Sequence, residues 1–443
     1  MNYYTSSSND LAIIQSRDLW DWVIIATIFI GMVGLLYIGI NTSIFDHWIA
    51  YQRHWLVWPT IAWISMGILL LILRTVLWLK YRPFPSETES SAPSLTVVIP
   101  AYNEGSMVEN SIDSVARADY PRDRLQIIVI DDGSRDDTWS YIESTARRYP
   151  DLVTTIRFSE NRGKRAALAE GFRCARGEIV ITIDSDSVIE HRTLLAMVGP
   201  FRESRIGAVA GKVAVYNRSR GLLPRMLHVR FTLSFDFLRS TQSEYGTVYC
   251  CPGALAAYRI SVVRQILDQW ENQRFLGAFC TFGEDRALTN FILDAGHDTV
   301  YQRTGIVHTV VPETYRKLCK MYLRWDRSYV REETRFSKIV WKRPPIFCAI
   351  SLFDRTITNL RYPIAYISLV LLVLYTMDDP MVIPRMMIGI GLVSTFYMLY
   401  FLRSERSWDF LYGVLYAYFS FFTLLWIFPY AVLTVRARSW LTR

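Results

Sequence analysis

The segment LTVVIPAYNE, residues 95–104, has the pattern of a buried strand that runs into a loop. The segments LQIIVIDDGS (125–134) and GEIVITIDSDS (177–187) repeat this pattern. Their continuous β-branched and aliphatic runs are typical of parallel strands that are covered on both faces. Helical patterns at 106–117 and 136–148 separate them. Strands that alternate with helices predict an α/β fold with a doubly wound sheet.

Each of the three strands ends in carboxylates, which are Glu104, Asp131 with Asp132, and Asp184 with Asp186. Ligands of doubly wound sheets bind beyond the carboxyl ends of the strands, where these side chains are expected. A single acid of this kind can also form a turn or cap a helix. However, Asp184 and Asp186 flank one residue directly after a strand, and hard oxygen ligands so placed suit Mg²⁺ or Mn²⁺. The pattern predicts a metal site whose natural partner is a diphosphate.

The segment NRGKRAAL (161–168) predicts a short turn that opens a helix with Lys164 and Arg165. The start of such a helix attracts phosphate, although a solvated basic turn is the alternative. The sequence contains neither GxGxxG nor GxxxxGK[ST], which disfavours a dinucleotide site and a P-loop.

The segment FGEDRALTNFIL (282–293) places Glu284 and Asp285 at the start of an amphipathic helix. Alone, this is an ordinary acidic helix start. Next to a nucleotide diphosphate site, the pair becomes a candidate for the catalytic general base.

The composition indicates a soluble block joined to membrane segments. Of 443 residues, 51% are hydrophobic and 20% are charged, and the mean hydropathy is +0.15. The net charge of +8 fits basic flanks of membrane helices, and no basic run interleaves with aromatic residues as in a nucleic-acid site. The six cysteines have no metal-binding spacing, which argues for a reduced, cytoplasmic setting. Apolar runs that could enter a membrane occur at 22–40, 55–79, 346–376, 381–402 and 408–435.

We therefore expect five regions: an N-terminal cytoplasmic segment at 1–21, two transmembrane helices within 22–80, a linker at 81–92, a cytoplasmic domain with interface helices at 93–345, and transmembrane or interfacial helices at 346–443. The protein would be a multi-pass protein of the cell membrane.

The number of C-terminal crossings stays open. A basic C-terminus inside the cell requires an even number of crossings, whereas three apolar runs follow the domain. Asp354, Arg355 and Arg361, in the first of these runs, either line a polar path or lie at the membrane interface.

Seven segments occur in an order that resembles the processive family-2 glycosyltransferases: VIPAYNE, VIDDGS, NRGKRAAL, IDSDS, CCPGALAAYR, FGEDRALTN and YLRWDRSYVRE. The sequence is most similar to hyaluronan synthases and to the related chitin-type oligosaccharide synthases of nodulating bacteria. The resemblance covers about residues 93–335. It implies a GT-A-like nucleotide-binding domain inserted between transmembrane helices, with UDP-sugar donors, a growing polysaccharide acceptor and the lipid bilayer as partners. It indicates no nucleic acid and no particular protein partner.

The resemblance implies donor-binding roles at the strand ends. The uridine end of the donor would contact Tyr102, Glu104, Asp131 and Asp132. Lys164, with Arg165 beside it, would meet the diphosphate. Asp184 and Asp186 would hold Mg²⁺ or Mn²⁺, with Asp186 as the direct ligand.

The resemblance also implies an acceptor side. Asp285, next to Glu284, would be the base, and Cys251 and Gly253 would line the acceptor pocket. Arg324 and Trp325 belong to the QxxRW element of the family. The flat face of Trp325 is suited to stack on an acceptor sugar while Arg324 offers planar donors.

Three departures from the family pattern lie on this acceptor side. Met321 replaces the glutamine of QxxRW. The family's usual Gly-Pro after the cysteine is also replaced, because Pro252 precedes the glycine here and Ala254 follows it. The acidic motif is GED in place of the more frequent GDD, with the presumed base retained. The changes at Met321 and at Pro252 and Ala254 bear on the product and on processivity more than on donor binding.

The resemblance therefore implies an inverting, processive β-glycosyltransferase that makes hyaluronan from UDP-N-acetylglucosamine and UDP-glucuronate and secretes it through its own transmembrane region. One alternative is a chitin-type synthase that uses UDP-N-acetylglucosamine alone. Others are a non-processive transferase that acts on a lipid phosphate and a channel with a regulatory nucleotide domain.

Overall fold

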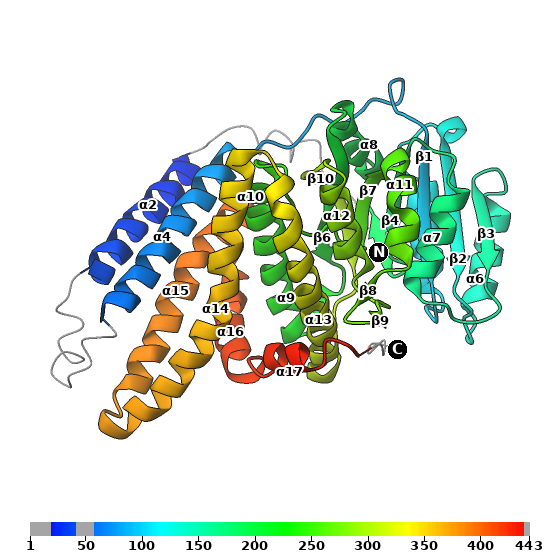
Figure 1. Cartoon of the computed structure of the whole chain (residues 1–443). Coiled ribbons are helices and arrows are strands. Elements are labelled where there is room, and N and C mark those ends of the chain that lie inside the picture. Colours follow the sequence, from blue (N-terminus) through cyan, green and yellow to red (C-terminus); the bar gives the residue numbers. More distant parts are fainter. Residues whose placement is uncertain (1–18, 41–56, 438–443) are drawn as a thin grey trace. The chain divides into compact units, whose positions relative to one another are not determined.

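The computed structural model describes residues 19–40 and 57–437 (Figure 1). The described residues form two compact units. One contains those up to Thr75 together with Thr356–Val414. The other contains Val76–Arg355 together with the described residues from Leu415 onward.

An eight-stranded sheet forms the core of the second unit (Figure 1). The strands, in their order across the sheet, are β3 (Val153–Arg157), β2 (Leu125–Asp131), β1 (Leu95–Ala101), β4 (Ile179–Ile183), β7 (Leu255–Arg259), β6 (Ile206–Val215), β10 (Asp298–Thr309) and β5 (Ser187–Ile189). A separate two-stranded hairpin contains β8 (Arg274–Phe275) and β9 (Ala278–Phe279).

The first four strands of the sheet are parallel, since β1 pairs with β2 and β4, and β2 with β3. β7 is antiparallel to both β4 and β6, whereas β10 is parallel to β6 and antiparallel to β5. The predicted doubly wound sheet is confirmed in this first half, and the second half is mixed. The chain moves outward from β1 to β3 and then returns to β4 on the other side of β1. The winding therefore reverses between β1 and β4, which is where such sheets bind ligands.

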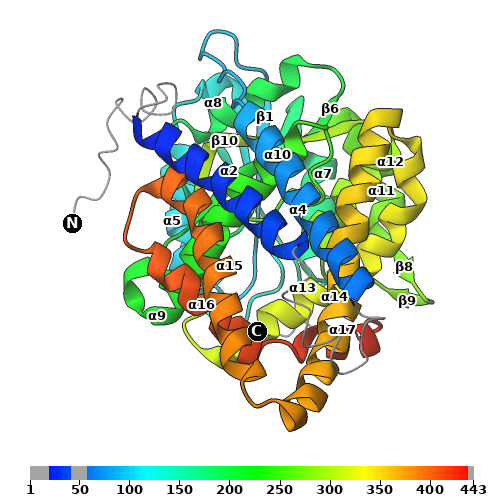
Figure 2. The same ribbon diagram turned by 90° about the vertical axis from the view of Figure 1, so that its left-hand side faces the viewer.

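Helices cover both faces of the sheet. α5 (Met107–Ala116) and α6 (Thr138–Arg148) pack together on one face, and α7 (Lys164–Cys174), α11 (Ile260–Glu271) and α12 (Glu284–Asp294) pack on the other (Figure 2). Every residue of β1 and β4 is buried, which explains their uninterrupted apolar sequences.

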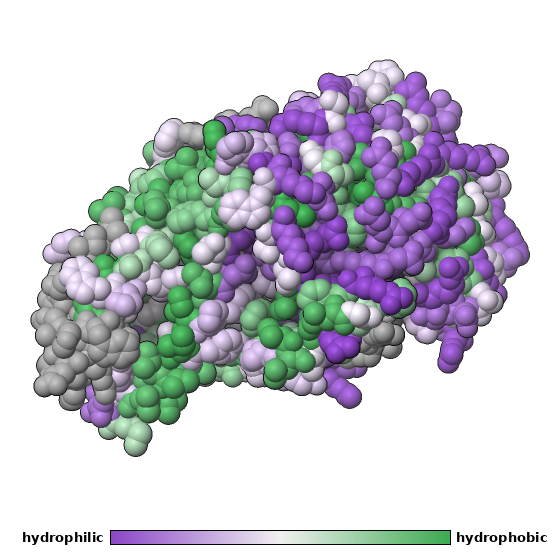
Figure 3. All heavy atoms as spheres, in the orientation of Figure 1, coloured by the Kyte–Doolittle hydropathy of each residue, from purple (hydrophilic) through white to green (hydrophobic). Residues whose placement is uncertain are grey.

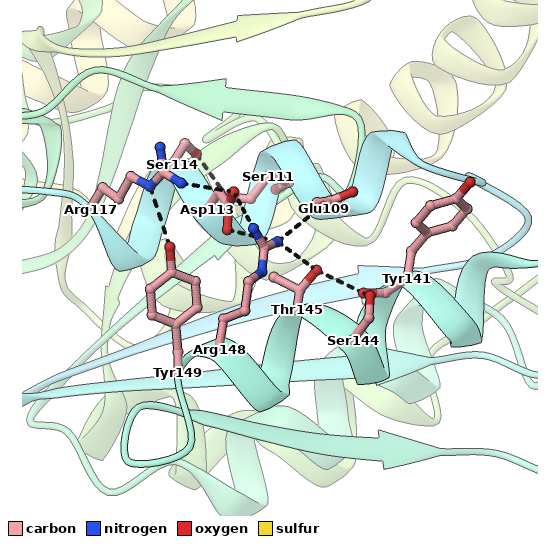
Figure 4. A network of polar contacts seen from close by, with 10 residues as sticks. All are labelled: Glu109, Ser111, Asp113, Ser114, Arg117, Tyr141, Ser144, Thr145, Arg148 and Tyr149. Carbon is pink, nitrogen blue, oxygen red and sulfur yellow. Dashed lines mark hydrogen bonds and ion pairs between the residues drawn. The ribbon is translucent and has the colours of Figure 1, made fainter.

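The contact between α5 and α6 is polar at its surface (Figure 4). The Arg148 guanidinium lies 2.7 Å from Glu109 Oε1 and 3.2 Å from Asp113 Oδ1, and Arg117 Nε donates to the Tyr149 hydroxyl at 3.3 Å. These exposed pairs hold the two helices in register at the solvent side, while the buried side chains of both helices face the sheet.

The polar segment 81–92, expected as a linker, packs on the sheet domain. The backbone of Phe84 exchanges two hydrogen bonds with the Gln302 side chain, at 3.1 and 2.9 Å. Glu87 is buried and forms an ion pair with Arg202. The Tyr81 hydroxyl donates to the Tyr301 carbonyl at 2.9 Å. The segment is thus a fixed part of this unit.

Further helices complete the second unit. They are α8 (Thr193–Val198), α9 (Leu222–Thr232), the π-helix η6 (Leu233–Arg239), α10 (Ser240–Ser243) and α13 (Tyr315–Ile339). The long helix α13 packs on α12 and on the C-terminal helix α17 (Ile427–Leu433). It therefore connects the sheet domain to the end of the described chain.

The apolar runs form helices α2 (Leu19–Ile40), α4 (Val57–Lys80), α14 (Pro345–Asp378) and α15 (Val382–Glu405). Among the described residues, α4, α14 and α15 are long and apolar enough to cross a membrane. The last run divides into α16 (Phe410–Thr423) and α17, which are bent by 50°. Apolar side chains gather over these helices and hydrophilic ones over the sheet domain (Figure 3). The direction and number of crossings stay predictions.

Helices α2 and α15 pack against each other (Figure 2). A Cβ atom at Gly31 would lie 2.7 Å from the Phe396 ring, so glycine permits this close approach.

Candidate active site

The loops after β1, β2 and β4 meet at the carboxyl edge of the sheet. Ser185 Oγ donates to Glu104 Oε1 at 2.9 Å, which joins the loops after β4 and β1. The Asn103 N–H donates to Ser134 Oγ at 3.0 Å and thereby joins the loops after β1 and β2. Tyr102 is half-buried at the same strand end. Side chains from three separate strand ends therefore form one connected edge.

Lys164 connects two acidic motifs at this edge. Its Nζ forms an ion pair with Asp184 Oδ1 and lies 3.4 Å from Glu284 Oε1. Burial by itself lowers the pKa of Lys164, but the two carboxylates outweigh burial and raise it. Burial likewise opposes ionisation of Glu284, yet the Lys164 cation brings the pKa of Glu284 below its usual value. A lysine and two carboxylates from distant parts of the sequence thus meet at this edge.

Asp285 lies in the first turn of α12, beside this cluster. Its Oδ2 accepts the Gly253 N–H at 3.3 Å and the Cys250 thiol at 3.6 Å. Burial raises the pKa of Asp285, and the negative charge of Glu284 raises it further. Burial and the Asp285 carboxylate raise the pKa of Cys250 to about 12, so this thiol stays protonated and can donate. A carboxylate with a raised pKa is a stronger base, which suits Asp285 to accept a proton.

Gly253 lies between Asp285 and Lys164. While its N–H donates to Asp285, a Cβ atom at this position would come within 2.8 Å of Lys164 Nζ. With any side chain at residue 253, the Lys164 ammonium group would therefore have to move from this position.

The side chain of Cys251 does not reach this cluster. It is fully buried, and its backbone N–H donates to Thr289 Oγ1 at 3.0 Å. The neighbouring Cys250 makes the contact to Asp285 instead, so the structure brings Cys250, and not the predicted Cys251, to the acidic motif.

Asp131 and Asp132 are buried and bind the protein backbone. Asp131 Oδ1 accepts the Ser134 N–H at 3.1 Å. The two oxygens of Asp132 accept the N–H groups of Arg162 at 2.8 Å and Gly163 at 2.9 Å. Burial raises the pKa of Asp132 to about 6, against the effect of these hydrogen bonds. Asp132 thus holds the turn that precedes Lys164.

Arg165 points away from the predicted diphosphate site. Only 5% of it is exposed, its guanidinium donates to the Trp270 carbonyl and to Gln273 Oε1, and it lies 5.1 Å from the centre of the Trp270 ring. Successive residues at the start of a helix point in different directions, so Lys164 and Arg165 cannot face the same ligand. The expectation that Arg165 binds the donor is corrected: it anchors α7 to α11.

Asp184 and Asp186 are half-buried and follow β4 one residue apart. Asp186 Oδ1 accepts hydrogen bonds from Ser187 Oγ at 3.3 Å and Thr309 Oγ1 at 3.4 Å. Within the described parts of the chain, no three His, Cys, Asp or Glu side chains form a metal cluster. A pair of carboxylates fits Mg²⁺ or Mn²⁺ in a site that phosphate oxygens and water complete. The donor set therefore fits the predicted ion.

Helix α13 is held against the start of α12 by a glycine and a buried polar network. Gly283 has a φ of +71°, and a Cβ atom there would lie 2.0 Å from Ser328 Oγ. The Arg331 guanidinium donates to the Phe282 carbonyl at 2.6 Å. Glu332 accepts hydrogen bonds from Gln273 at 2.9 Å and Asn290 at 3.1 Å. The network positions Glu284 and Asp285 relative to α13.

The Arg-Trp element lies on α13. Trp325 is 42% exposed, and its ring lies 5.5 Å from the Tyr322 ring and 6.2 Å from the Phe231 ring. Arg324 is half-buried, and its charge contributes to the low pKa of Glu284. Met321, in place of the expected glutamine, is buried in an apolar cluster with Leu227. Trp325 thus presents an open aromatic surface on α13, next to the half-buried Arg324.

Sequence reasoning did not find Cys250, Gln273, Asn290 or Glu332. Gln273 and Asn290 lie 59 and 42 residues from Glu332, and single polar residues at such separations carry no local signal. The only usable signal was the adjacent pair Arg331-Glu332 within an otherwise amphipathic helix, because buried charges need partners.

Comparisons with known proteins bear on the family of this chain. Residues 96–267 match the model of glycosyl transferase family 2. An N-acetylglucosaminyltransferase of Azorhizobium caulinodans is 30% identical over 353 residues, which are 79% of this chain and 87% of that protein. A hyaluronan synthase of Streptococcus pyogenes is 33% identical over 292 residues, which are 63% of this chain and 68% of that protein.

A solved structure has a similar fold. The mannosyltransferase PcManGT from Pyrobaculum calidifontis, in complex with GDP-Man and Mn²⁺, has a TM-score of 0.56 at 23% identity, over 82% of this chain and 98% of that one. The mixed α/β sheet domain of this chain thus has a GT-A-like fold. The chain therefore belongs to glycosyl transferase family 2 and is related to N-acetylglucosaminyltransferases and hyaluronan synthases.

Proposed function

We propose that this protein is a membrane-bound, processive, inverting β-glycosyltransferase that uses UDP-N-acetylglucosamine. The observation that carries the proposal is the position of Lys164, which contacts Asp184 on the donor side and Glu284, next to Asp285, on the other. A donor diphosphate and a base must lie on opposite sides of the reacting carbon for a single inverting displacement. The names of the relatives support an N-acetylglucosamine donor.

In the proposed reaction, the acceptor hydroxyl attacks C1 of the donor sugar from the face opposite UDP. Asp285 takes the hydroxyl proton as the new bond forms, and its raised pKa suits this role. The bond from C1 to the diphosphate breaks, and Lys164 stabilises the negative charge on the departing UDP. Glu284 stays ionised and holds Lys164 in place.

Asp184 and Asp186 are the proposed ligands of Mg²⁺ or Mn²⁺, which would neutralise charge on the diphosphate. Glu104 would support this loop through Ser185. Tyr102 is the proposed contact to the uridine, and Asp131 and Asp132 would act through the loops that they hold.

Trp325 is the proposed platform for the acceptor sugar. Its exposed ring can stack on the CH face of the sugar, and Arg324 and Gly253 are further proposed contacts of the acceptor. The cytoplasmic side is the proposed location of the domain, with the apolar helices as the route by which the polymer leaves.

The proposed product is hyaluronan, made from UDP-N-acetylglucosamine and UDP-glucuronate. A second candidate is a chitin-type oligosaccharide, which needs UDP-N-acetylglucosamine alone. The observation that keeps this second candidate is the long alignment with the N-acetylglucosaminyltransferase of A. caulinodans, over 87% of that protein.

Polymerisation with defined donors tests both the reaction and the product. Purified protein in lipid nanodiscs with Mn²⁺ would receive each radiolabelled donor alone and then both together. Polymer that forms only with both donors supports hyaluronan, and polymer from UDP-N-acetylglucosamine alone supports the chitin-type product. No transfer from any UDP-sugar would contradict the proposed function.

A further inference from the structure

Arg286 places a positive charge next to the proposed base. It follows Asp285 in the first turn of α12, and its side chain is 22% exposed. Its charge lowers the pKa of both Asp285 and Cys250, against the stronger effect of burial. The Arg286 backbone N–H also donates to Asp285 Oδ1 at 2.7 Å, so Arg286 adjoins the carboxylate that is the proposed base.

Two residues of α13 hold the Arg286 guanidinium. It lies 5.2 Å from the centre of the Tyr329 ring, and its Nη1 lies 3.8 Å from Glu333 Oε1. Tyr329 and Glu333 follow Trp325 by four and eight residues, so the three side chains lie along one side of the helix. The proposed acceptor platform and the partners of Arg286 thus share one rigid element.

Glu333 is held in turn by α14. Arg355, in the third turn of that helix, donates through Nη2 and Nε to the two carboxylate oxygens, at 2.5 and 2.9 Å. Its Nη2 also donates to the Tyr329 hydroxyl at 2.7 Å. The rings of Tyr249 and Tyr329 flank the Arg355 guanidinium, with centroids at 4.5 and 5.3 Å. A bidentate pair enclosed by two aromatic rings fixes the carboxylate more firmly than a surface ion pair does.

The three side chains carry two positive charges and one negative charge in a shielded place. The Glu333 side chain is 13% exposed and that of Arg355 is 10% exposed. Without Glu333, Arg286 and Arg355 would be left as neighbouring buried cations, and Arg286 would turn away.

We propose that Glu333 is a positioning residue for the transfer reaction: supported by Arg355 of α14, it holds Arg286 beside Asp285. This inference rests on the proposed function. It connects the first part of a candidate membrane helix to the base without any contact between that helix and the substrate. The sequence had offered Arg355 as a residue of a polar path or of the membrane interface; the geometry assigns it to this support.

A double-mutant cycle tests the inference, with transfer from radiolabelled UDP-N-acetylglucosamine, in the presence of UDP-glucuronate, as the readout. Glu333→Gln and Arg286→Gln are each expected to lower kcat about tenfold, with the donor KM unchanged within about twofold. Because Glu333 acts through Arg286, the double variant should be no slower than the slower single variant. Multiplication of the two losses would overturn the proposal, since it would mean independent roles.

Two further variants separate positioning from folding. Arg335→Gln breaks a comparable pair on α13, with Asp294 at 3.2 Å, and should leave kcat unchanged. Glu333→Gln combined with Arg355→Gln removes the carboxylate together with its buried cation. This double variant replaces Glu333→Gln in the test if the single variant does not fold. It should show the same loss of kcat as Glu333→Gln alone.

The outcomes distinguish the two proposals. If the wild-type protein is active and both Glu333→Gln and its combination with Arg355→Gln have the same kcat as the wild type, Glu333 has no positioning role. The proposed function would then remain intact. Absence of transfer by the wild-type protein with every UDP-sugar would remove the proposed function and this inference together.

Discussion

The donor and acceptor sides of the site are built in different ways. On the donor side, Asp132 and Asp184 each follow a strand directly, and Glu104 lies three residues after the end of another. Their partners lie on neighbouring strand ends or turns. On the acceptor side, Asp285 and Trp325 come from helices α12 and α13, whose contact depends on buried residues far apart in the sequence. Because the two sides are built from different elements, we expect substitutions in α12 or α13 to lower the rate of transfer without lowering the affinity for UDP.

Replacement of the proposed base should produce the largest difference between the loss of transfer and the loss of UDP affinity. Asp285→Asn removes the proton acceptor but keeps its size, so transfer should fall by about a factor of 10²–10⁴. UDP affinity, measured by isothermal titration calorimetry, should stay within about threefold of wild type. Asp268→Asn, on the exposed side of α11, is the matched control and should leave the rate unchanged. Substantial turnover in Asp285→Asn would remove this residue from the role of base.

The converse change acts on the donor side. Asp186→Ala should weaken Mn²⁺-dependent UDP binding by about 10- to 100-fold, because one proposed ligand of the ion is lost. Calorimetry with and without Mn²⁺ measures this, and Asp123→Ala in an exposed turn provides the control. If the variant binds UDP as the wild type does in Mn²⁺, the ion is held elsewhere.

Trp325→Ala tests the acceptor platform. Loss of the stacking surface should lower polymer synthesis by about tenfold while UDP affinity stays the same. Trp341→Ala removes a more exposed tryptophan, 69% exposed, shortly after α13, and should have no such effect. Equal losses of UDP affinity and of synthesis in Trp325→Ala would place this ring on the donor side.

The dependence of the rate on pH gives a further measure of Asp285. Its ionised form accepts the proton, so kcat/KM should fall by about tenfold for each pH unit below its pKa. Because burial and Glu284 raise that pKa, the fall should begin above the usual aspartate value of about 3.9. UDP affinity over the same pH range corrects for the donor side, where Asp132 has a pKa of about 6. An acidic limb at or below the usual value would contradict the proposed environment of Asp285.

The smallest expected effect concerns the packing of α12 on α13. Gly283→Ala should lower the free energy of unfolding by more than Gly296→Ala, although both glycines have positive φ. The left-handed conformation costs about 1–2 kcal/mol in either variant. Only at residue 283 would the new Cβ also collide with Ser328, whereas nothing lies within 4 Å at residue 296. Thermal unfolding of the two variants checks this, and equal destabilisation would mean that α13 can move away without loss.

Much of the donor side could be predicted from the sequence. The runs that end in Glu104, Asp131 and Asp184 contain both the strand and its terminal acid, and parallel strands bring those ends to the same edge. The directions in which neighbouring side chains point could not be predicted as well from the sequence. Lys164 and Arg165 looked equivalent in the sequence, but the helix turns the second into the core against Trp270. Cys250 and Cys251 differ in the same way, since only the first reaches Asp285.

The sequence by itself determined the α/β class, the parallel strands and the order of the acidic motifs, because these depend on local periodicity and on where apolar runs end. Three features came only from the tertiary structure: Lys164 joins Asp184 to Glu284, Gly253 lies against Lys164, and Arg286, Glu333 and Arg355 form one cluster. Those contacts join residues between 20 and 120 positions apart along the chain. Such pairs meet only after the helices have packed on the sheet, and no local pattern encodes that packing.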